Sequence, residues 1–153
     1  MDLDLGYRKA SVNDLSAIVN LLLDDELGHM QEKSSAKIDH CYLDAFALID
    51  SDPNQYLMVV ENSGDIIATC HLTIMPSLTF SGSTRMQIEA VRVAGKLRGH
   101  KIGEWMILKA IEYGKSRGVA IIQLTTNIKR PRAKTFYERL GFESTHVGMK
   151  LHL

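Results

Sequence analysis

Apolar residues recur every three or four positions in four stretches of the chain, a spacing typical of amphipathic helices. Each stretch is followed by a glycine or a proline-containing turn, which can end a helix. A capping side chain precedes the first stretch, and a proline suits the first turn of the last one. The expected helices run from Ser11 or Asn13 toward Gly28, over 38–49, from Ile102 to Gly118, and from Pro131 to Gly141.

Runs rich in β-branched and apolar residues lie between these helices and predict strands. The expected strands cover 7–10, 56–61, 66–74, 86–93, 120–126 and 142–151. Asn62-Ser63-Gly64-Asp65 has the composition of a hairpin turn, so the second and third strands should pair antiparallel. A polar loop is expected over 76–84. The order of elements predicts a mixed α/β (α+β) sheet in one domain over residues 1–153.

The charges of the chain balance, because Lys plus Arg and Asp plus Glu each total 18. Without a net positive field we expect no nucleic-acid partner, and any anionic ligand must be bound locally. The N-terminus lacks the pattern of a signal peptide, and no apolar run approaches the length of a membrane span. Cys41 and Cys70 cannot make a disulfide framework, so we expect a cytoplasmic setting with no membrane contact.

A basic, glycine-containing loop joins the strand that ends at Val93 to the helix that starts near Ile102. Unpaired N–H groups and the helix dipole favour an anion such as a phosphate at such a helix start. Arg98, His100 and Lys101 would add positive charge. Alternatively, the glycines serve only a tight turn and close helix packing. The loop has neither the ending of a P-loop nor the three-glycine dinucleotide fingerprint.

Arg98-Gly99-His100-Lys101-Ile102-Gly103 resembles the pyrophosphate loop of the GNAT superfamily of N-acetyltransferases, which reads Arg/Gln-x-x-Gly-x-Gly/Ala after the fourth strand. Lys101 stands where the family has its first motif glycine. The segment 133–142 is similar to the family's Ala-x-x-Phe-Tyr-x-x-x-Gly-Phe motif, and Tyr7 to Leu15 is similar to its opening strand and helix. The resemblance implies a GNAT fold, a mixed and mostly antiparallel sheet whose fourth and fifth strands splay apart around the pantetheine arm of acetyl-CoA.

The resemblance also implies a set of site residues for acetyl-CoA, the expected co-substrate. Tyr137 matches the tyrosine that protonates the departing thiolate, although its ring could simply pack on the sheet. Either Asn127 or Arg130 would meet the pantetheine. The implied cofactor-binding residues are Val91, Arg92 and Val93 on the strand, Arg98, Gly99, His100, Lys101, Ile102, Gly103 and Glu104 at the loop and helix start, and Asn127 and Arg130.

Glu89 is the candidate general base, because an amine with a pKa of about 10 must lose a proton before it attacks. Strand alternation would place Gln87, Glu89, Val91 and Val93 on one face. Alternatively, Glu89 is an exposed carboxylate paired with Arg85 or another cation. His71 is a weaker base candidate.

Neighbouring His and Cys residues do not complete a set of metal ligands, so we expect no metal. The basic cluster Lys129, Arg130, Arg132 and Lys134 is a solvated face, or a contact for the CoA phosphates or for an acidic acceptor. The sequence therefore favours transfer of acetyl from acetyl-CoA to a primary amine of a small molecule or peptide by direct attack. A catalytically quiet acyl-CoA-binding or regulatory domain and an RNA-directed acetyltransferase are the alternatives. A homodimer is left open.

Overall fold

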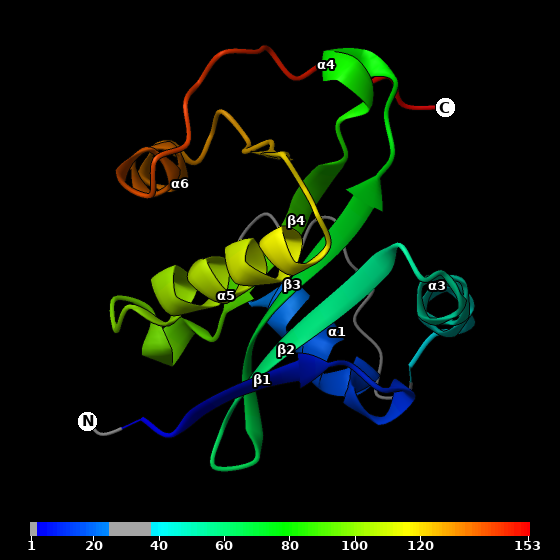
Figure 1. Ribbon diagram of the computed structural model, residues 1–153. Helices are drawn as coiled ribbons and strands as arrows, with labels where there is room; N and C mark the ends of the chain where they lie inside the picture. The colour runs from blue at the N-terminus through cyan, green and yellow to red at the C-terminus, as the bar shows by residue number, and fades with distance from the viewer. Residues whose placement is uncertain (1–2, 25–37) are drawn as a thin grey trace.

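The computed structural model describes residues 3–24 and 38–153, and within them five strands form one sheet in the order β1-β2-β3-β4-β5 (Figure 1). Strands β1 to β4 pair antiparallel, whereas β4 and β5 pair parallel, which confirms the expected mixed, mostly antiparallel sheet. The elements are β1 (Leu5–Lys9), η1 (Val12–Asp14), α1 (Leu15–Leu23), α3 (His40–Ser51), β2 (Gln55–Asn62), β3 (Asp65–Met75), α4 (Thr79–Gly82), β4 (Arg85–Val93), η2 (Gly95–Leu97), α5 (Ile102–Ser116), β5 (Ile121–Leu124) and α6 (Pro131–Arg139).

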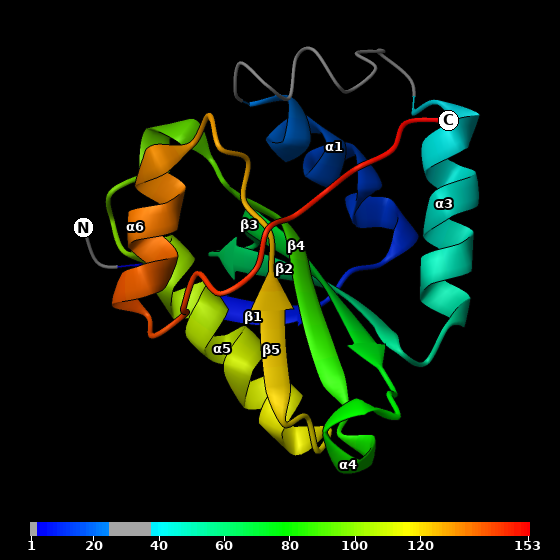
Figure 2. The same cartoon turned by 90° about the horizontal axis from the view of Figure 1, so that it is seen from above.

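Helices cover both faces of the sheet, with α5 on one face and α1 and α3 on the other (Figure 2). Successive strand residues point to opposite faces, so the central strands supply two cores. Met58, Leu72 and Ile88 are almost fully buried on the α5 side, while Leu57 and Val59 pack with α1 and α3. A strand that is buried on both faces carries a nearly continuous run of β-branched and apolar residues, and such runs located β2 and β3 in the sequence.

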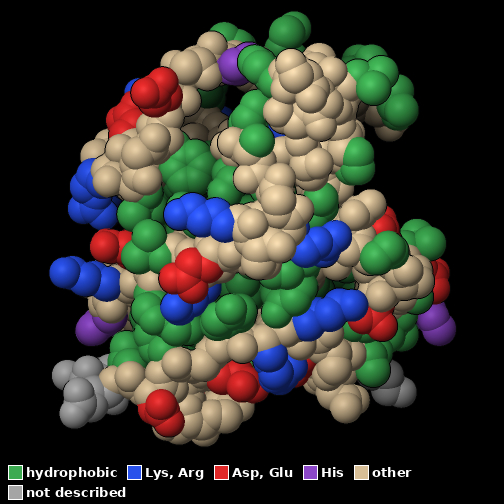
Figure 3. All heavy atoms as spheres, viewed as in Figure 1, with side chains coloured by type: hydrophobic (Ala, Val, Ile, Leu, Met, Phe, Trp, Pro, Cys, Tyr) green, Lys and Arg blue, Asp and Glu red, His purple; other side chains and the backbone are tan. Residues whose placement is uncertain are grey.

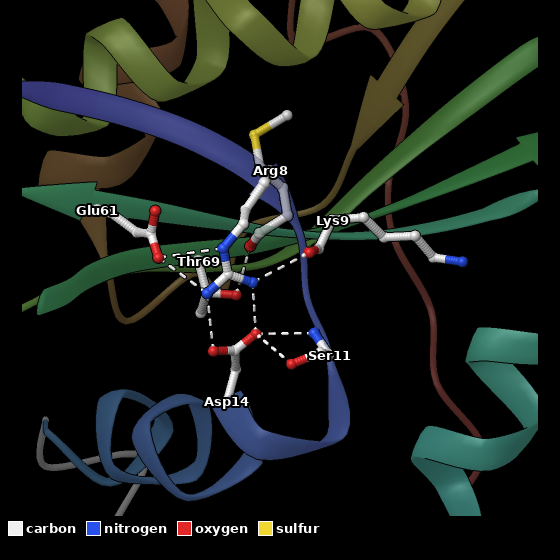
Figure 4. A network of polar contacts seen from close by, with 7 residues as sticks. Arg8, Lys9, Ser11, Asp14, Glu61 and Thr69 are labelled. Atoms are coloured by element: carbon white, nitrogen blue, oxygen red, sulfur yellow. Dashed lines mark hydrogen bonds and ion pairs between the residues drawn. The ribbon is translucent and has the colours of Figure 1, made fainter. Parts of the chain in front are cut away.

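The first strand is tied to the first helix by a polar network around Arg8 (Figure 4). The Arg8 guanidinium donates to both carboxylate oxygens of Asp14, at 2.7 and 2.9 Å, and to Glu61 at 2.8 Å. Asp14 also accepts from the backbone N–H of Ser11 at 2.7 Å. The hydrogen bond from Arg8 is the main cause that lowers the pKa of Asp14 to about 2, against the opposing effect of burial. The network fixes the angle at which the chain enters α1.

Two sequence expectations about the periphery are corrected by the structure. The expected polar loop over 76–84 contains the short turn α4, in which Phe80 and Ser81 have positive φ. Residues 142–151 form no strand, although Val147, Met149 and Leu151 alternate with other residues; all three side chains are 87% exposed or more. Alternation indicates that a segment could pair, but a strand also needs an adjacent partner, and β5 ends at Leu124.

The remaining boundaries agree with the sequence to within a few residues. Helix α1 is described as far as Leu23, so the expected end near Gly28 lies outside the described residues. Gly118 and Gly141 follow α5 and α6 with φ of +71° and +92°, the left-handed backbone that glycine adopts at helix ends. None of the described helices is both long and apolar enough to cross a membrane.

Candidate active site

Strands β4 and β5 pair only along the first half of β4. Their parallel pairing runs from Arg85 opposite Ile121 to Ile88 opposite Leu124, and β4 then continues to Val93 paired with β3 but not with β5. The edge of β4 from Glu89 onward therefore presents backbone groups that β5 does not pair. This confirms the expected splay of strands four and five.

A β-bulge in β4 changes which side chains share a face. His71 lies opposite Glu89 and Thr69 lies opposite Arg92, so β4 carries one more residue than β3 over this interval. Ala90 has a φ of +52° within this stretch. The extra residue reverses the alternation beyond Glu89, which places Arg92 on the Glu89 face.

The expectation that Gln87, Glu89, Val91 and Val93 share a face is therefore wrong. Val91 and Val93 pack against the core under α5 instead. A glycine inside the strand would have indicated a bulge in the sequence, but this bulge lies near an alanine, Ala90, which gives no such indication. A positive φ costs a non-glycine residue roughly 1–2 kcal/mol, so the surrounding strand pairing must hold it.

Polar side chains gather on the other face of β3 and β4. His71 Nε2 lies 2.5 Å from Gln55 Oε1, and His71 Nδ1 lies 3.9 Å from Glu89 Oε1. His71 is only 16% exposed, whereas the Glu89 side chain is 52% exposed, so solvent reaches the pair from the Glu89 side. Burial lowers the pKa of His71, and the nearby Glu89 charge opposes that effect. The ionisable neighbour of Glu89 is thus His71, whereas the alternative interpretation of the sequence named Arg85 or another cation.

The loop before α5 leaves the start of that helix open. Lys101, the residue before α5, makes no side-chain cap, so the first N–H groups of the helix have no side-chain acceptor from it. The buried side chain of Leu97 anchors the loop, and His100 Nδ1 folds back to the carbonyl oxygens of Leu97 and Arg98, at 3.2 Å from each. Gly99 has a φ of +85°. The arrangement is an uncapped helix N-terminus in a basic loop, which suits an anion.

Lys101 adopts the left-handed backbone conformation, with φ of +62° and ψ of +10°. This is the position at which the resembling motif has glycine, and glycine adopts such a conformation without a Cβ clash. The lysine therefore keeps the loop path and carries a strain of about 1 kcal/mol or more. The sequence showed the departure from the motif, and the structure shows its conformational cost.

Arg98 turns toward the end of α1, where it meets Asp24. Its Nε donates to the carbonyl oxygen of Val93 at 3.2 Å, and its Nη2 donates to the backbone carbonyl of Asp24 at 2.5 Å. The Asp24 carboxylate accepts from the backbone N–H of Gly95 at 2.5 Å. Asp24 was missed by the sequence reasoning, because only folding brings it to a loop some seventy residues later.

Gly103 lies where three elements meet. A Cβ built at this residue would stand 3.6 Å from both Phe136 Cζ on α6 and Val93 Cγ2 on β4. A Cβ at this distance would make ordinary van der Waals contact, so only a side chain larger than a methyl group would press against α6 and the strand. The neighbouring Ile102 is buried, and Glu104 is in the first turn of α5, where a carboxylate interacts favourably with the helix dipole.

Tyr137 belongs to α6 and is packed among aromatic rings. Its ring meets Phe136 and Phe142 edge to face, with centroids 5.0 and 5.8 Å away. Burial is the main cause that raises the pKa of Tyr137 to about 12, and the charges of Arg92 and Arg130 oppose it. The charges of Arg92 and Arg130, two residues that the sequence had nominated separately, therefore act on the Tyr137 hydroxyl.

Asn127 and the basic cluster lie around the start of α6. Asn127 is exposed, and its Oδ1 accepts from the Lys129 backbone N–H at 2.9 Å, so the side chain shapes the turn before α6. In the basic cluster, Lys134 pairs with Glu138 at 2.6 Å, which neutralises part of its charge. Arg132 and Arg139 line a hollow of about 310 Å³ on α6 with Pro131, Thr135 and Phe136. Since Phe136 also approaches Gly103, this hollow lies close to the start of α5.

The two cysteines lie in different environments. Burial raises the pKa of the Cys70 thiol to about 12, so it is a protonated packing group. Cys41 is exposed on α3. Over residues 3–24 and 38–153, no group of three or more His, Cys, Asp or Glu side chains is arranged to hold a metal ion.

Comparisons with known proteins agree with this geometry. The model of the Acetyltransferase (GNAT) family matches residues 16–142. The aminoalkylphosphonate N-acetyltransferase of Salmonella typhimurium is 28% identical over 142 residues, which are 91% of this chain and 85% of that protein. The crystal structure of a transcriptional regulator from Bacillus halodurans is 40% identical, with a TM-score of 0.95 over 97% of this chain and 99% of that one.

A third comparison concerns the co-substrate. A predicted acetyltransferase from Clostridium acetobutylicum, whose crystal structure contains acetyl-CoA, shares 21% identity and a TM-score of 0.75 over 97% of this chain and 96% of that one. At this identity the likeness shows the fold alone. The family match spans most of the described sheet, from α1 to the end of α6, and includes both motifs. This chain is a member of the GNAT family of acetyltransferases.

Proposed function

We propose that this enzyme moves an acetyl group from acetyl-CoA to a primary amine of a small molecule or peptide. The observation that carries the proposal is that β4 separates from β5 beside Glu89 and His71. The uncapped N-terminus of α5 follows β4 closely in the chain. The parted edge offers backbone groups to an extended ligand, and the pair offers proton acceptors. Few other functions would use both features.

The binding of CoA would use the groups around the start of α5. Backbone N–H groups from Gly99 to Glu104 would hold the pyrophosphate, with positive charge from His100 and Lys101. Arg98 would add its charge while tied to Asp24. The parted edge of Val91, Arg92 and Val93 would pair with the pantetheine, and Arg130 would approach it from α6. The hollow on α6 supplies two further arginines for phosphate.

The chemistry requires two protons to leave an ammonium nitrogen, one before the attack and one as the amide forms, and one proton to reach the thiolate. The second nitrogen proton can replace, by way of solvent, the proton that the acid donates. Glu89, directly or through His71, would take the proton of the ammonium, after which the neutral amine attacks the thioester carbon. A nitrogen–carbon bond forms, and the carbon–sulfur bond breaks. An N–H on the parted edge of β4 would polarise the carbonyl oxygen. Tyr137 would give its proton to the leaving sulfur, and a pKa of about 12 keeps that proton in place at neutral pH.

Direct attack is favoured over an acyl-enzyme intermediate. A cysteine nucleophile acts as its thiolate, and burial keeps the Cys70 thiol protonated. The relative in Salmonella typhimurium is named for an aminoalkylphosphonate, a small amine that carries a phosphonate. That name supports a small, charged primary amine as the acceptor.

Two alternative functions, a catalytically quiet binding domain and an RNA-directed enzyme, differ in their support. The Bacillus halodurans structure is described as a transcriptional regulator, which makes a catalytically quiet acyl-CoA-binding domain the second candidate. An RNA-directed enzyme would need a broad positive surface. The chain has no net charge, and acidic and basic side chains are interspersed over the face in Figure 3.

The proposal is tested by binding and turnover together. Acetyl-CoA should raise the melting temperature and give a calorimetric binding signal, whereas NADH and ATP should do much less. A panel of primary amines, aminoalkylphosphonates included, should then release free CoA thiol in an amine-dependent manner. Binding without thiol release for any amine would favour the quiet domain. Absence of binding at saturating acetyl-CoA would refute the proposed cofactor site.

A further inference from the structure

A chain of polar contacts leads from the end of α3 to Glu89. Asp52, the residue that follows α3, accepts the Asn54 backbone N–H on Oδ1 at 2.8 Å and faces Gln55 Nε2 with Oδ2 at 3.4 Å. Gln55 Oε1 lies 2.5 Å from His71 Nε2. His71 Nδ1 lies 3.9 Å from Glu89 Oε1. Three strands and a helix end thus contribute to one line of contacts.

The direction of each hydrogen bond follows from what the groups can donate. A carboxylate only accepts, so the Gln55 amide must turn its NH₂ toward Asp52 and its carbonyl toward His71. Thr73 Oγ1 donates to the same carbonyl oxygen at 3.5 Å, which agrees with this orientation. Since a carbonyl oxygen also only accepts, His71 Nε2 must carry the hydrogen. In the neutral ring, Nδ1 then carries the lone pair.

In this tautomer, His71 Nδ1 and the Glu89 carboxylate are two hydrogen-bond acceptors that face each other with no hydrogen between them. The lone pair on His71 Nδ1 and the Glu89 carboxylate are 3.9 Å apart, and burial favours the neutral ring by lowering the pKa of His71. One ammonium nitrogen can donate to both at about 2.8–3.0 Å, because its N–H bonds diverge. The opposite tautomer would place a hydrogen on Nδ1, directed toward Glu89, and would remove one of the two acceptors for the ammonium.

We propose that Asp52 and Gln55 are positioning residues that hold His71 as its Nε2–H tautomer, so that Nδ1 and the Glu89 carboxylate together receive the ammonium of the acceptor. This inference rests on the proposed acetyltransferase function and specifies how the amine is recognised. It also gives His71 a role that the sequence had ranked below Glu89. Protonated amines should bind here in preference to alcohols of the same shape, because both acceptors need a donor.

The turn that carries Gln55 is held independently of the Gln55 side chain. The Ile74 backbone N–H donates to the Asn54 carbonyl at 2.7 Å, and Arg117 Nη1 on the far end of α5 donates to the Pro53 carbonyl at 3.2 Å. The Gln55 backbone N–H bonds to the Asp52 carbonyl at 3.0 Å. A change confined to the Gln55 side chain should therefore leave the turn in place.

The tautomer can be measured without any substrate. Long-range proton–nitrogen correlation spectra of histidine-labelled protein should show His71 protonated on Nε2 and bare on Nδ1. Gln55→Met, which keeps length and removes the acceptor, should shift His71 toward the Nδ1–H form. Thr73→Val, which removes only the longer contact, should leave the wild-type pattern. A wild-type His71 protonated on Nδ1 would overturn the inference, whether or not the enzyme transfers acetyl.

Kinetics then test the consequence for the amine. Gln55→Met should raise the KM for the amine and lower kcat/KM by roughly tenfold, the effect of one misdirected hydrogen bond. The KM for acetyl-CoA should stay unchanged, and Thr73→Val should behave as wild type. A shifted tautomer with an unchanged kcat/KM for the amine would contradict the role in amine recognition. If the wild type itself showed no amine-dependent turnover, the proposed function would instead be refuted.

Discussion

Two carboxylates, Asp14 just before α1 and Glu89 on β4, have opposite surroundings. Asp14 receives two bonds from Arg8 and one from the Ser11 backbone, and its side chain is 9% exposed. Glu89 is 52% exposed and faces a histidine nitrogen that offers it no hydrogen in the tautomer inferred above. The first cluster is complete within the protein, whereas the second has room for a donor from outside.

This contrast separates stability from function. A buried polar group with all its hydrogen bonds stabilises the fold, and losing one partner costs free energy of unfolding. A group left with spare acceptors gains a partner only when a ligand arrives, so it contributes to binding or catalysis instead. The following substitutions should affect one property and spare the other.

The largest effect on turnover is expected for Tyr137→Phe, which changes a functional group and should spare stability. The ring keeps its contacts with Phe136 and Phe142, so the fold and acetyl-CoA affinity should hold. Loss of a general acid should lower kcat by roughly a hundredfold to ten-thousandfold in single-turnover assays, and less for a thioester of a more acidic thiol. Tyr7→Phe on β1 is the matched control. An unchanged kcat, with chemistry rate-limiting, would make Tyr137 a packing residue.

Glu89→Gln should reduce kcat/KM for the amine by about a hundredfold, because the amide cannot accept the proton. The free energy of unfolding should change by less than about 0.5 kcal/mol, since the side chain is half exposed. Glu112→Gln, an exposed carboxylate on α5 that pairs with Lys109, provides the comparison. Equal activity of the Glu89 and Glu112 variants would remove Glu89 from the mechanism.

Asp14→Asn should lower the free energy of unfolding by about 2 kcal/mol, as expected for lost charge-assisted hydrogen bonds. The pKa of Asp14 is lowered to about 2 in the folded protein, below its unfolded value of about 3.9. The ionised carboxylate therefore contributes its full share to the free energy of unfolding above about pH 4. This contribution is lost as the pH falls from about 4 to about 2. Denaturation at several pH values should show the wild type and variant converging over that window.

The control for this substitution is Asp44→Asn on the exposed face of α3, which should leave stability almost unchanged. Activity per folded molecule should be the same in both variants and the wild type. A gap between wild type and Asp14→Asn that persisted at pH 2 would show that the stabilisation does not come from the charged carboxylate.

The smallest effect is expected for Lys101→Gly, which should raise the free energy of unfolding by about 1 kcal/mol. The gain comes from relief of the left-handed backbone at Lys101, whose φ is +62°. Acetyl-CoA affinity should change little in calorimetry, because the backbone N–H groups are retained. Lys96→Gly, at a loop residue without positive φ, should not stabilise. A large loss of affinity in Lys101→Gly would show that the lysine ammonium carries the phosphate contact.

Local patterns predicted much of this structure, and tertiary contacts account for the rest. The helical periods found α3, α5 and α6, and the motif residues led to Tyr137 and the loop before α5. The bulge at Ala90 was hidden, because nothing about an alanine signals an extra strand residue. The apolar alternation over 142–151 suggested a strand that the structure does not form.

The contacts of Asp24 and Gln55 were equally invisible from the sequence. Asp24 meets the loop at Gly95, and Gln55 meets His71 sixteen residues later along a strand hairpin. Neither residue type is unusual in its local context, and only the registers of the strands and the end of α1 bring the partners together. Periodicity reports which face a residue occupies, whereas the hydrogen bonds it makes depend on the neighbouring element.

The most direct test is to measure amine-dependent thiol release by Glu89→Gln and Asp14→Asn side by side, at a temperature where both are fully folded. The account predicts that Glu89→Gln loses about a hundredfold in kcat/KM while melting like the wild type. Asp14→Asn should melt earlier and keep wild-type turnover. If Asp14→Asn lost turnover while folded and Glu89→Gln kept it, the division between a stabilising and a functional carboxylate would be wrong.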